Sequence, residues 1–219
     1  MSCNIDWAAT GSMLSGVGAV CGVIAIVWAA LAGKSALKDW RGERLAGREV
    51  EVAEQTLKAA YRAKDAIEGM RIRVIWGGEL ESAEKALEEA GLNLEVYESN
   101  EKSLHVRRGV IYRRAELFKD DFNAIFDAIP SAKIFFGADA ELNLREYLKA
   151  RQRILSSADI LPMMTEPLRD EDRKVMSEIN RDLLGKWSDE QEDKVGAMVA
   201  EATEKLEAML LPKLRLQKL

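Results

Sequence analysis

The chain has little of what metal, redox and nucleophilic chemistry requires. Its 219 residues include one histidine, His105, and two cysteines, Cys3 and Cys21. A single histidine cannot supply a His-based metal set or a Ser-His-Asp triad within one chain. Because no cysteine follows residue 21, no disulfide framework holds the rest of the sequence, which fits a reducing compartment. We therefore expect no catalytic residue, no metal and no cofactor, and interpret the chain as a non-enzyme.

An excess of basic residues is also missing. Lys and Arg number 32 against 37 Asp and Glu, which gives a formal net charge of −5 at pH 7. Phosphate recognition needs a concentrated basic face, so we expect no nucleic-acid partner. With 47% apolar and 32% charged residues, the composition is that of a chain that folds.

Charge is absent altogether between Asp6 and Lys34. This run of 27 residues reads WAATGSMLSGVGAVCGVIAIVWAALAG. From Trp7 to Trp28 a helix rises about 31 Å, which matches the ~30 Å hydrocarbon core of a bilayer and places an indole at either interface. The sequence therefore predicts a transmembrane segment over residues 1–33. A cleaved secretory leader is the alternative, but the residues before the run contain no Lys or Arg.

Basic residues follow the run and set its expected orientation. Five lie within 15 residues of Gly33, against two acids, Asp39 and Glu43. The positive-inside rule then leaves the C-terminal part in the cytoplasm and the N-terminus outside. We expect the inner, cytoplasmic membrane as the location. The residues predicted to lie at the membrane interface are Trp7, Trp28, Lys34, Lys38 and Arg41.

Small residues recur through the run at helical spacing. The stripe comprises Gly11, Ser15, Gly18, Gly22, Ala25, Ala29, Ala32 and Ala36. Steps of four and three residues keep them on one helix face, and Gly18 with Gly22 forms a GxxxG pair. Lipid provides no hydrophobic drive between helices, so association depends on close backbone approach. We expect a homo-oligomer formed through the stripe residues of the span: Gly11, Ser15, Gly18, Gly22, Ala25, Ala29 and Ala32.

Apolar residues after the run continue the helical spacing. A stripe from Ala46 to Ile67 predicts that one helix continues from the membrane to about residue 70, so that 34–70 form a juxtamembrane stalk. Later amphipathic segments are centred on 111–129, which ends at Pro130, and on 139–161, 175–183 and 188–210. The predicted fold is all-α, with a single N-terminal transmembrane helix that continues into an antiparallel helical bundle over 71–219.

One segment leaves an alternative open. The run from Arg71 to Trp76 and the alternating Leu92, Leu94 and Val96 flank a Glu-rich helical pattern, which is typical of a small βαβ insertion at about 71–98. A two-stranded sheet is a poor independent unit, so we favour a loop with a short helix.

Four arginines form a candidate anion- or partner-binding cluster. They are Arg107, Arg108, Arg113 and Arg114. Their guanidinium groups can bind a phosphate, another anionic ligand or an acidic partner. Pairing with the nearby Glu116, Asp120 and Asp121 is the alternative interpretation.

A diffuse set of residues resembles a group of bacterial proteins. The set comprises Trp40, Arg41, Ala53, Leu57, Ala60, Tyr61, Lys64, Asp65, Ala66, Ile67, Arg71, Phe136, Gly137, Trp187, Asp193, Glu207 and Pro212. With these residues the chain resembles uncharacterised bacterial single-pass inner-membrane proteins with a helical cytoplasmic domain. The resemblance implies a helical, membrane-attached protein and carries no known catalytic residues.

Three functional hypotheses follow from these patterns. The first is a noncatalytic membrane protein that self-associates through its span and presents its helical domain to a protein partner or assembly. The second is a pore-forming, membrane-perturbing effector of phage defence or stress, gated by that domain. Its span offers only Ser12, Ser15 and backbone as a polar lining. The third is an anion-binding sensor built on the arginine cluster, which has no base, nucleophile or metal set beside it.

Overall fold

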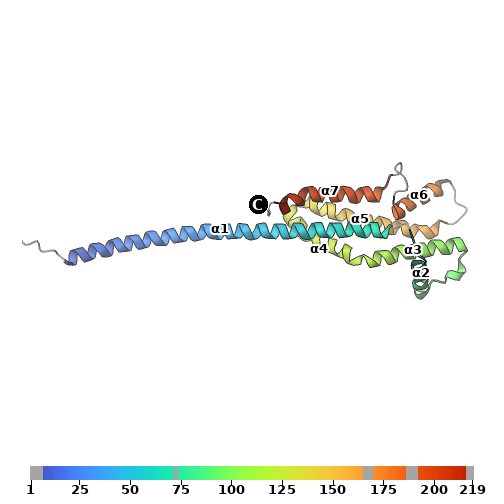
Figure 1. Ribbon diagram of the computed structural model, residues 1–219, viewed down its shortest axis with the longest axis horizontal. Coiled ribbons are helices and arrows are strands. Elements are labelled where there is room, and N and C mark those ends of the chain that lie inside the picture. The colour runs from blue at the N-terminus through green and yellow to red at the C-terminus, as the bar shows by residue number, and fades with distance from the viewer. Residues whose placement is uncertain (1–6, 72–73, 165–169, 186–191, 216–219) are drawn as a thin grey trace, which may run out of the picture. The chain divides into compact units, whose positions relative to one another are not determined.

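The computed structural model describes residues 7–71, 74–164, 170–185 and 192–215 (Figure 1). Side chains are described from residue 40 onward within these ranges, and before that only at 26, 28, 29, 31, 33, 34 and 38. The described part contains seven α-helices, two short 3-10 helices and no strand. The all-α prediction is confirmed.

The first helix, α1, runs without a break from Trp7 to Met70. This confirms the prediction of one helix that continues to about residue 70. The chain divides into two compact units, Met1–Arg48 and Glu49–Leu219, and α1 contributes to both. The predicted stalk at 34–70 is therefore divided at Arg48, and the bundle begins at Glu49 instead of residue 71.

In the first unit, the described side chains from Trp40 to Arg48 are all exposed. The Arg44 guanidinium lies 4.5 Å from the centroid of the Trp40 ring, a cation–π contact one helical turn apart. Among the described residues, no helix combines the length and the apolar character needed to cross a membrane. Most side chains of the predicted span lie outside the described residues.

The second unit is a helical bundle. After α1 come α2 (Gly77–Glu89), η1 (Leu94–Val96), α3 (Ser99–Leu117), α4 (Lys119–Phe136), α5 (Ala138–Ile160), η2 (Leu161–Met163), α6 (Asp170–Leu184) and α7 (Lys194–Arg215). Helix α5 packs against both α4 and α7, and α2 packs against α3. One core of apolar side chains joins α1, α4, α5 and α7, with Ile67, Phe122, Tyr147 and Leu206 fully buried. The bundle prediction is confirmed at this level.

Helices α1 and α7 run antiparallel. Three polar pairs join them in reverse order: Glu49 with Lys213 at 2.9 Å, Tyr61 with Glu207 at 2.8 Å, and Arg71 with Asp193 at 2.6 Å. Partner numbers on α7 fall as those on α1 rise, so the C-terminal end of α7 lies where α1 enters the bundle.

Two glycines permit close connections in the bundle. Gly137 has a φ of 86°, a left-handed conformation that glycine adopts without strain, and it alone separates α4 from α5. Gly69 on α1 faces the Phe118 ring so closely that an added Cβ would lie 2.5 Å from a ring carbon. The ring therefore packs directly on the α1 backbone at the junction between α3 and α4.

The prediction of one helix that ends at Pro130 is wrong. The chain breaks at Phe118, and α4 continues through Pro130 to Phe136. Pro130 is exposed, so the Phe126 carbonyl that loses its amide donor can bond water. Between 74 and 98 the chain forms α2 and η1, which favours the loop-and-helix interpretation over the βαβ alternative.

Candidate functional site

The predicted oligomerisation residues fall mainly outside the described side chains. Those outside are Gly11, Ser15, Gly18, Gly22, Ala25 and Ala32, together with the interface residue Trp7. Ala29 is exposed, and the Trp28 ring is 74% exposed. Lys34, Lys38 and Arg41 are also exposed, as basic residues at a membrane interface would be in an isolated chain.

Two of the clustered arginines bind helices that are distant in sequence. Arg108 donates to the Asp159 carboxylate on α5 at 2.9 Å, and Arg107 donates to the Asn180 side-chain oxygen on α6 at 3.4 Å. Burial lowers the pKa of Arg107. These contacts pack α3 against α5 and α6.

The other two arginines reach α2. Arg113 donates to the Ser82 carbonyl at 2.9 Å. Arg114 is buried and donates to both Glu79 oxygens, at 2.9 and 2.8 Å, and to the Val74 carbonyl. The hydrogen bonds from Arg114 hold the pKa of Glu79 below its ordinary value.

The arginine cluster thus spreads over three neighbouring helices. None of its described hydrogen bonds goes to Glu116, Asp120 or Asp121, the partners that sequence proximity indicated. Glu116 pairs instead with Lys119, and Asp121 with Arg62 on α1. Anion binding by this cluster stays a prediction. An anion would have to share each guanidinium group with the protein acceptor that it already binds.

His105 lies on α3 against Tyr97, which packs on the small apolar cluster between α2 and α3. Its ring lies 4.4 Å from the Tyr97 ring, and its Nδ1 is buried without a hydrogen-bond partner in the described part of the chain. Burial, and then the charge of Arg108, lower the pKa of His105. Among the described residues, no group of three or more His, Cys, Asp or Glu side chains could hold a metal ion.

Arg71 joins the end of α1 to two other helices. Its side chain is 8% exposed, and its Nε and Nη2 donate to the Asp182 and Arg181 carbonyls, in the last turn of α6, at 2.9 and 2.8 Å. It also donates to both Asp193 oxygens, at 3.2 and 2.6 Å. A planar guanidinium can satisfy carbonyls and a carboxylate at once, because its five donors form a rigid fork.

Asp193 in turn caps the start of α7. Its Oδ1 accepts from the Gly196 amide at 2.9 Å. Burial works to raise the pKa of Asp193, but the hydrogen bonds from Arg71 and the Gly196 amide outweigh burial and hold that pKa below its ordinary value. The carboxylate therefore stays ionised where α1, α6 and α7 meet.

Several residues that carry the family resemblance contact one another. Arg71 pairs with Asp193, and the Tyr61 hydroxyl donates to Glu207. Both pairs join α1 to α7 across more than a hundred residues of sequence, so spacing contained no signal for them. Trp187, another residue of that set, lies outside the described residues.

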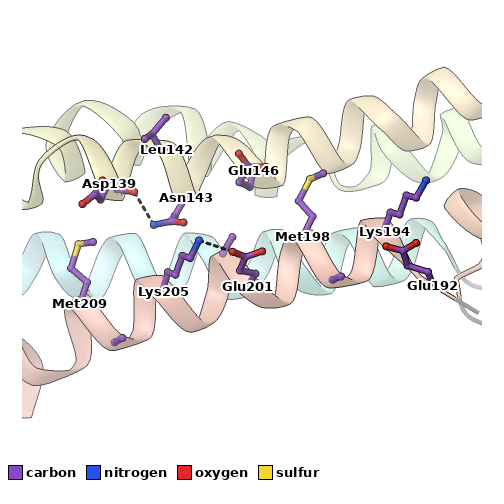
Figure 2. Close-up of a pocket in the computed structure, with 13 residues that line it drawn as sticks. Asp139, Leu142, Asn143, Glu146, Glu192, Lys194, Met198, Glu201, Lys205 and Met209 are labelled. Atoms are coloured by element: carbon purple, nitrogen blue, oxygen red, sulfur yellow. Dashed lines mark hydrogen bonds and ion pairs between the residues drawn. The ribbon is translucent and has the colours of Figure 1, made fainter. Parts of the chain in front are cut away.

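An open groove runs between α5 and α7 (Figure 2). Its volume is about 1080 Å³. Figure 2 shows Asp139 and Met209 at one end and Glu192 and Lys194 at the other. The α7 side contributes alanines and methionines at helical spacing, and the α5 side contributes Leu142, which is 55% exposed. The sequence analysis did not identify this groove, because its two walls come from segments more than 40 residues apart.

Charged residues line the groove unevenly. It contains four carboxylates, those of Asp139, Glu146, Glu192 and Glu201, and two ammonium groups, those of Lys194 and Lys205. Such an arrangement, an apolar floor with an acidic rim, can bind a surface of opposite charge.

Comparison with known proteins adds no relative: no family model matches this chain, and neither the curated proteins nor the solved structures compared with it include a match.

Proposed function

We propose that this chain is a noncatalytic single-pass membrane protein that self-associates through α1 and presents the bundle of Glu49–Leu219 to a protein partner. In this proposal residues 7–33 cross the inner membrane, with the N-terminus outside and the bundle in the cytoplasm. The basic residues from Lys34 to Arg48 would lie at the cytoplasmic interface.

The observation that carries the proposal is the continuity of α1. One helix holds the uncharged run and, beyond it, the stripe that forms the bundle core. A segment that crosses lipid must form all its backbone hydrogen bonds internally, and a continuous helix does so.

Exposure along α1 supports self-association. The described side chains from Trp40 to Arg48 find no cover within one chain, and Trp40 and Leu45 are 50% and 65% exposed. Contact with a second helix would remove these apolar side chains from water. Trp40 lies four residues after Ala36, on the same face as the small-residue stripe, so contact along that stripe would also cover Trp40.

Crosslinking of the full chain in native membranes tests the proposal. Gly18→Leu and Gly22→Leu should weaken oligomers about tenfold, because each places a bulky side chain in a close helix contact. Gly16→Leu is the matched control, since Gly16 lies in the same span on the opposite face. Equal effects of all three would overturn the oligomerisation, and recovery of the intact chain without detergent after alkaline extraction would overturn the membrane span.

A further inference from the structure

We propose that the groove between α5 and α7 is the docking site for an amphipathic helix of a partner protein that carries basic residues toward both of its ends. This inference rests on the proposed function in one respect, since it names the class of partner that the bundle presents itself to.

The length of the groove fits a helix. Its α7 wall extends from Lys194 to Met209. Fifteen residue steps at 1.5 Å give about 22 Å, or roughly four helical turns. An amphipathic helix of that length places four to five apolar side chains on one face, at the i, i+3, i+4 and i+7 positions. Side chains at these positions bind in grooves of this kind.

The floor of the groove permits close approach. Ala197, Ala202 and Ala208 contribute short side chains to the α7 wall. Met198 and Met209 contribute long ones, with Met209 at the same end as Asp139 (Figure 2). Methionine side chains are unbranched and polarizable, so they adapt their shape to an incoming apolar surface. Leu142 on the opposite wall is a large apolar side chain that docking would remove from water.

The charges of the groove select a basic occupant. Both lysines already form ion pairs, Lys205 with Glu201 at 2.6 Å and Lys194 with Glu178 at 3.8 Å. Among the described residues, no hydrogen bond or ion pair within 4 Å involves the carboxylate of Asp139 or Glu192, although the charge of Asp139 acts on Lys205 from farther away. Figure 2 places the two carboxylates at opposite ends of the groove. A docked helix that carries Lys or Arg about four turns apart would pair with both.

The same charges disfavour other occupants. In a symmetric pairing of two copies, this acidic lining would face itself, and like charges brought together lower affinity. An anionic membrane surface is repelled for the same reason. A basic partner helix is the occupant that the charges favour.

Peptide binding to the full chain in lipid nanodiscs tests the inference. The probe is a fluorescein-labelled, 18-residue designed helix with a leucine face and lysines near both ends, followed by anisotropy. Two control peptides have the same length: one scrambles the order and so destroys the apolar face, and one replaces lysine with glutamate. We expect the probe to bind at least tenfold more tightly than either control, as an anchored, charge-matched helix should. Equal binding of a control overturns the proposal.

Two matched substitutions locate the binding. Ala208→Trp fills the groove from an exposed position, whereas Ala200→Trp adds the same side chain to an exposed position of α7 outside the lining. Ala208→Trp should weaken binding about tenfold and Ala200→Trp less than twofold. Asp139→Asn and Glu192→Gln should each weaken binding about threefold and reduce its salt dependence. Helical content and melting temperature are measured for every variant, and equal affinities of the two tryptophan variants overturn the proposal.

Crosslinking in cells identifies the natural occupant. A photoreactive residue at position 208 should crosslink a basic, amphipathic segment of another protein, and the same residue at 200 should not. A crosslink to lipid, to a second copy or to an acidic segment, or no crosslink above that at 200, overturns the proposal.

Failure here and failure of the proposed function are distinguishable. The groove lies within the bundle, so Gly22→Leu should weaken oligomers about tenfold and leave the affinity for the probe peptide unchanged. Alkaline extraction reports on the span alone, and the two tryptophan variants report on the groove alone.

Discussion

Two consecutive parts of α1 have the same backbone and opposite surroundings. From Trp40 to Arg48 every side chain is exposed. Between Val52 and Met70, one face of the helix is buried, and Ala53, Ala60 and Ala63 on that face are completely buried. Alanine in the second part lets α7 and α4 approach closely, while alternating charges in the first part find no cover. Local propensity forms the helix in both, but burial needs a partner surface. The comparison teaches that a continuous helix can be formed by local propensity alone, whereas burial along it depends on which other segments pack against it.

The largest difference between the two parts should appear in truncations of aliphatic side chains. Ile67 is 1% exposed in the core, so Ile67→Ala should lower the free energy of unfolding by about 3 kcal/mol, through lost burial and the cavity left behind. Leu45→Ala, in the exposed part, should change it by less than about 0.5 kcal/mol. Urea unfolding of both variants checks this. Similar losses would mean that the first part is also packed, and would break the comparison.

The second largest loss of stability should come from replacing Arg71, at the polar end of the buried part. Arg71→Met removes the guanidinium donors from the Asp193 carboxylate and from the carbonyls at the end of α6, although the Gly196 amide still donates to Asp193. We expect a loss of about 2 kcal/mol at pH 7, less than for a fully buried pair because Asp193 is partly exposed. Arg41→Met in the exposed part should cost less than about 0.5 kcal/mol.

This loss should depend on pH. The folded pKa of Asp193 lies below the value of about 3.9 for an unfolded aspartate, so its contribution is present in full above about pH 4. The contribution disappears as pH falls through the folded pKa. The difference in the free energy of unfolding between the wild type and Arg71→Met, measured by urea unfolding, should therefore become smaller below pH 4. A difference that stays constant down to pH 2 would show that the ion pair is not its source.

The smallest effect concerns two hydroxyls at different depths. Tyr147 is fully buried and shares a 2.6 Å hydrogen bond with Thr203, whose hydroxyl also donates to the Val199 carbonyl. Tyr147→Phe should therefore cost about 1 kcal/mol. Tyr61→Phe, which removes the exposed hydrogen bond to Glu207, should cost less than Tyr147→Phe.

Alkaline unfolding sharpens the same contrast. Burial raises the pKa of Tyr147 to about 12, above the value of about 10 for an unfolded tyrosine. The contribution of the Tyr147 hydroxyl to the free energy of unfolding is therefore complete below about pH 10 and is lost as pH rises toward 12. The Phe variant should show a shallower loss of stability over that range, by thermal melts at each pH. An identical slope in both proteins would contradict the assigned cause.

Prediction from sequence worked where the information was local. The spacing of Ala53, Leu57, Ala60 and Ile67 predicted a helix that reaches residue 70, and α1 ends at Met70. Gly137 entered the sequence analysis only through the resemblance, and its left-handed φ forms the break between α4 and α5.

Prediction failed where the outcome depended on distant neighbours. Proline rules placed a helix end at Pro130, yet α4 continues because that position faces solvent, whereas the break falls at Phe118, whose ring packs on Gly69. The expected partners of Arg107 and Arg108 were nearby acids, but the observed ones lie on α5 and α6. The sequence analysis missed the groove, because in the sequence each of its walls has the pattern of an ordinary exposed helix face.

Sequence by itself determined that this chain is helical, where its long first helix ends, and that its first 33 residues differ chemically from the rest. These properties follow from the spacing of apolar residues and from the absence of charge, both of which are local. Only the tertiary structure decided which helices meet, which carboxylate each arginine binds, and that α5 and α7 leave an acidic groove between them. A side chain's partner depends on where distant segments pack, and hydrogen bonds and ion pairs act only over a few ångströms.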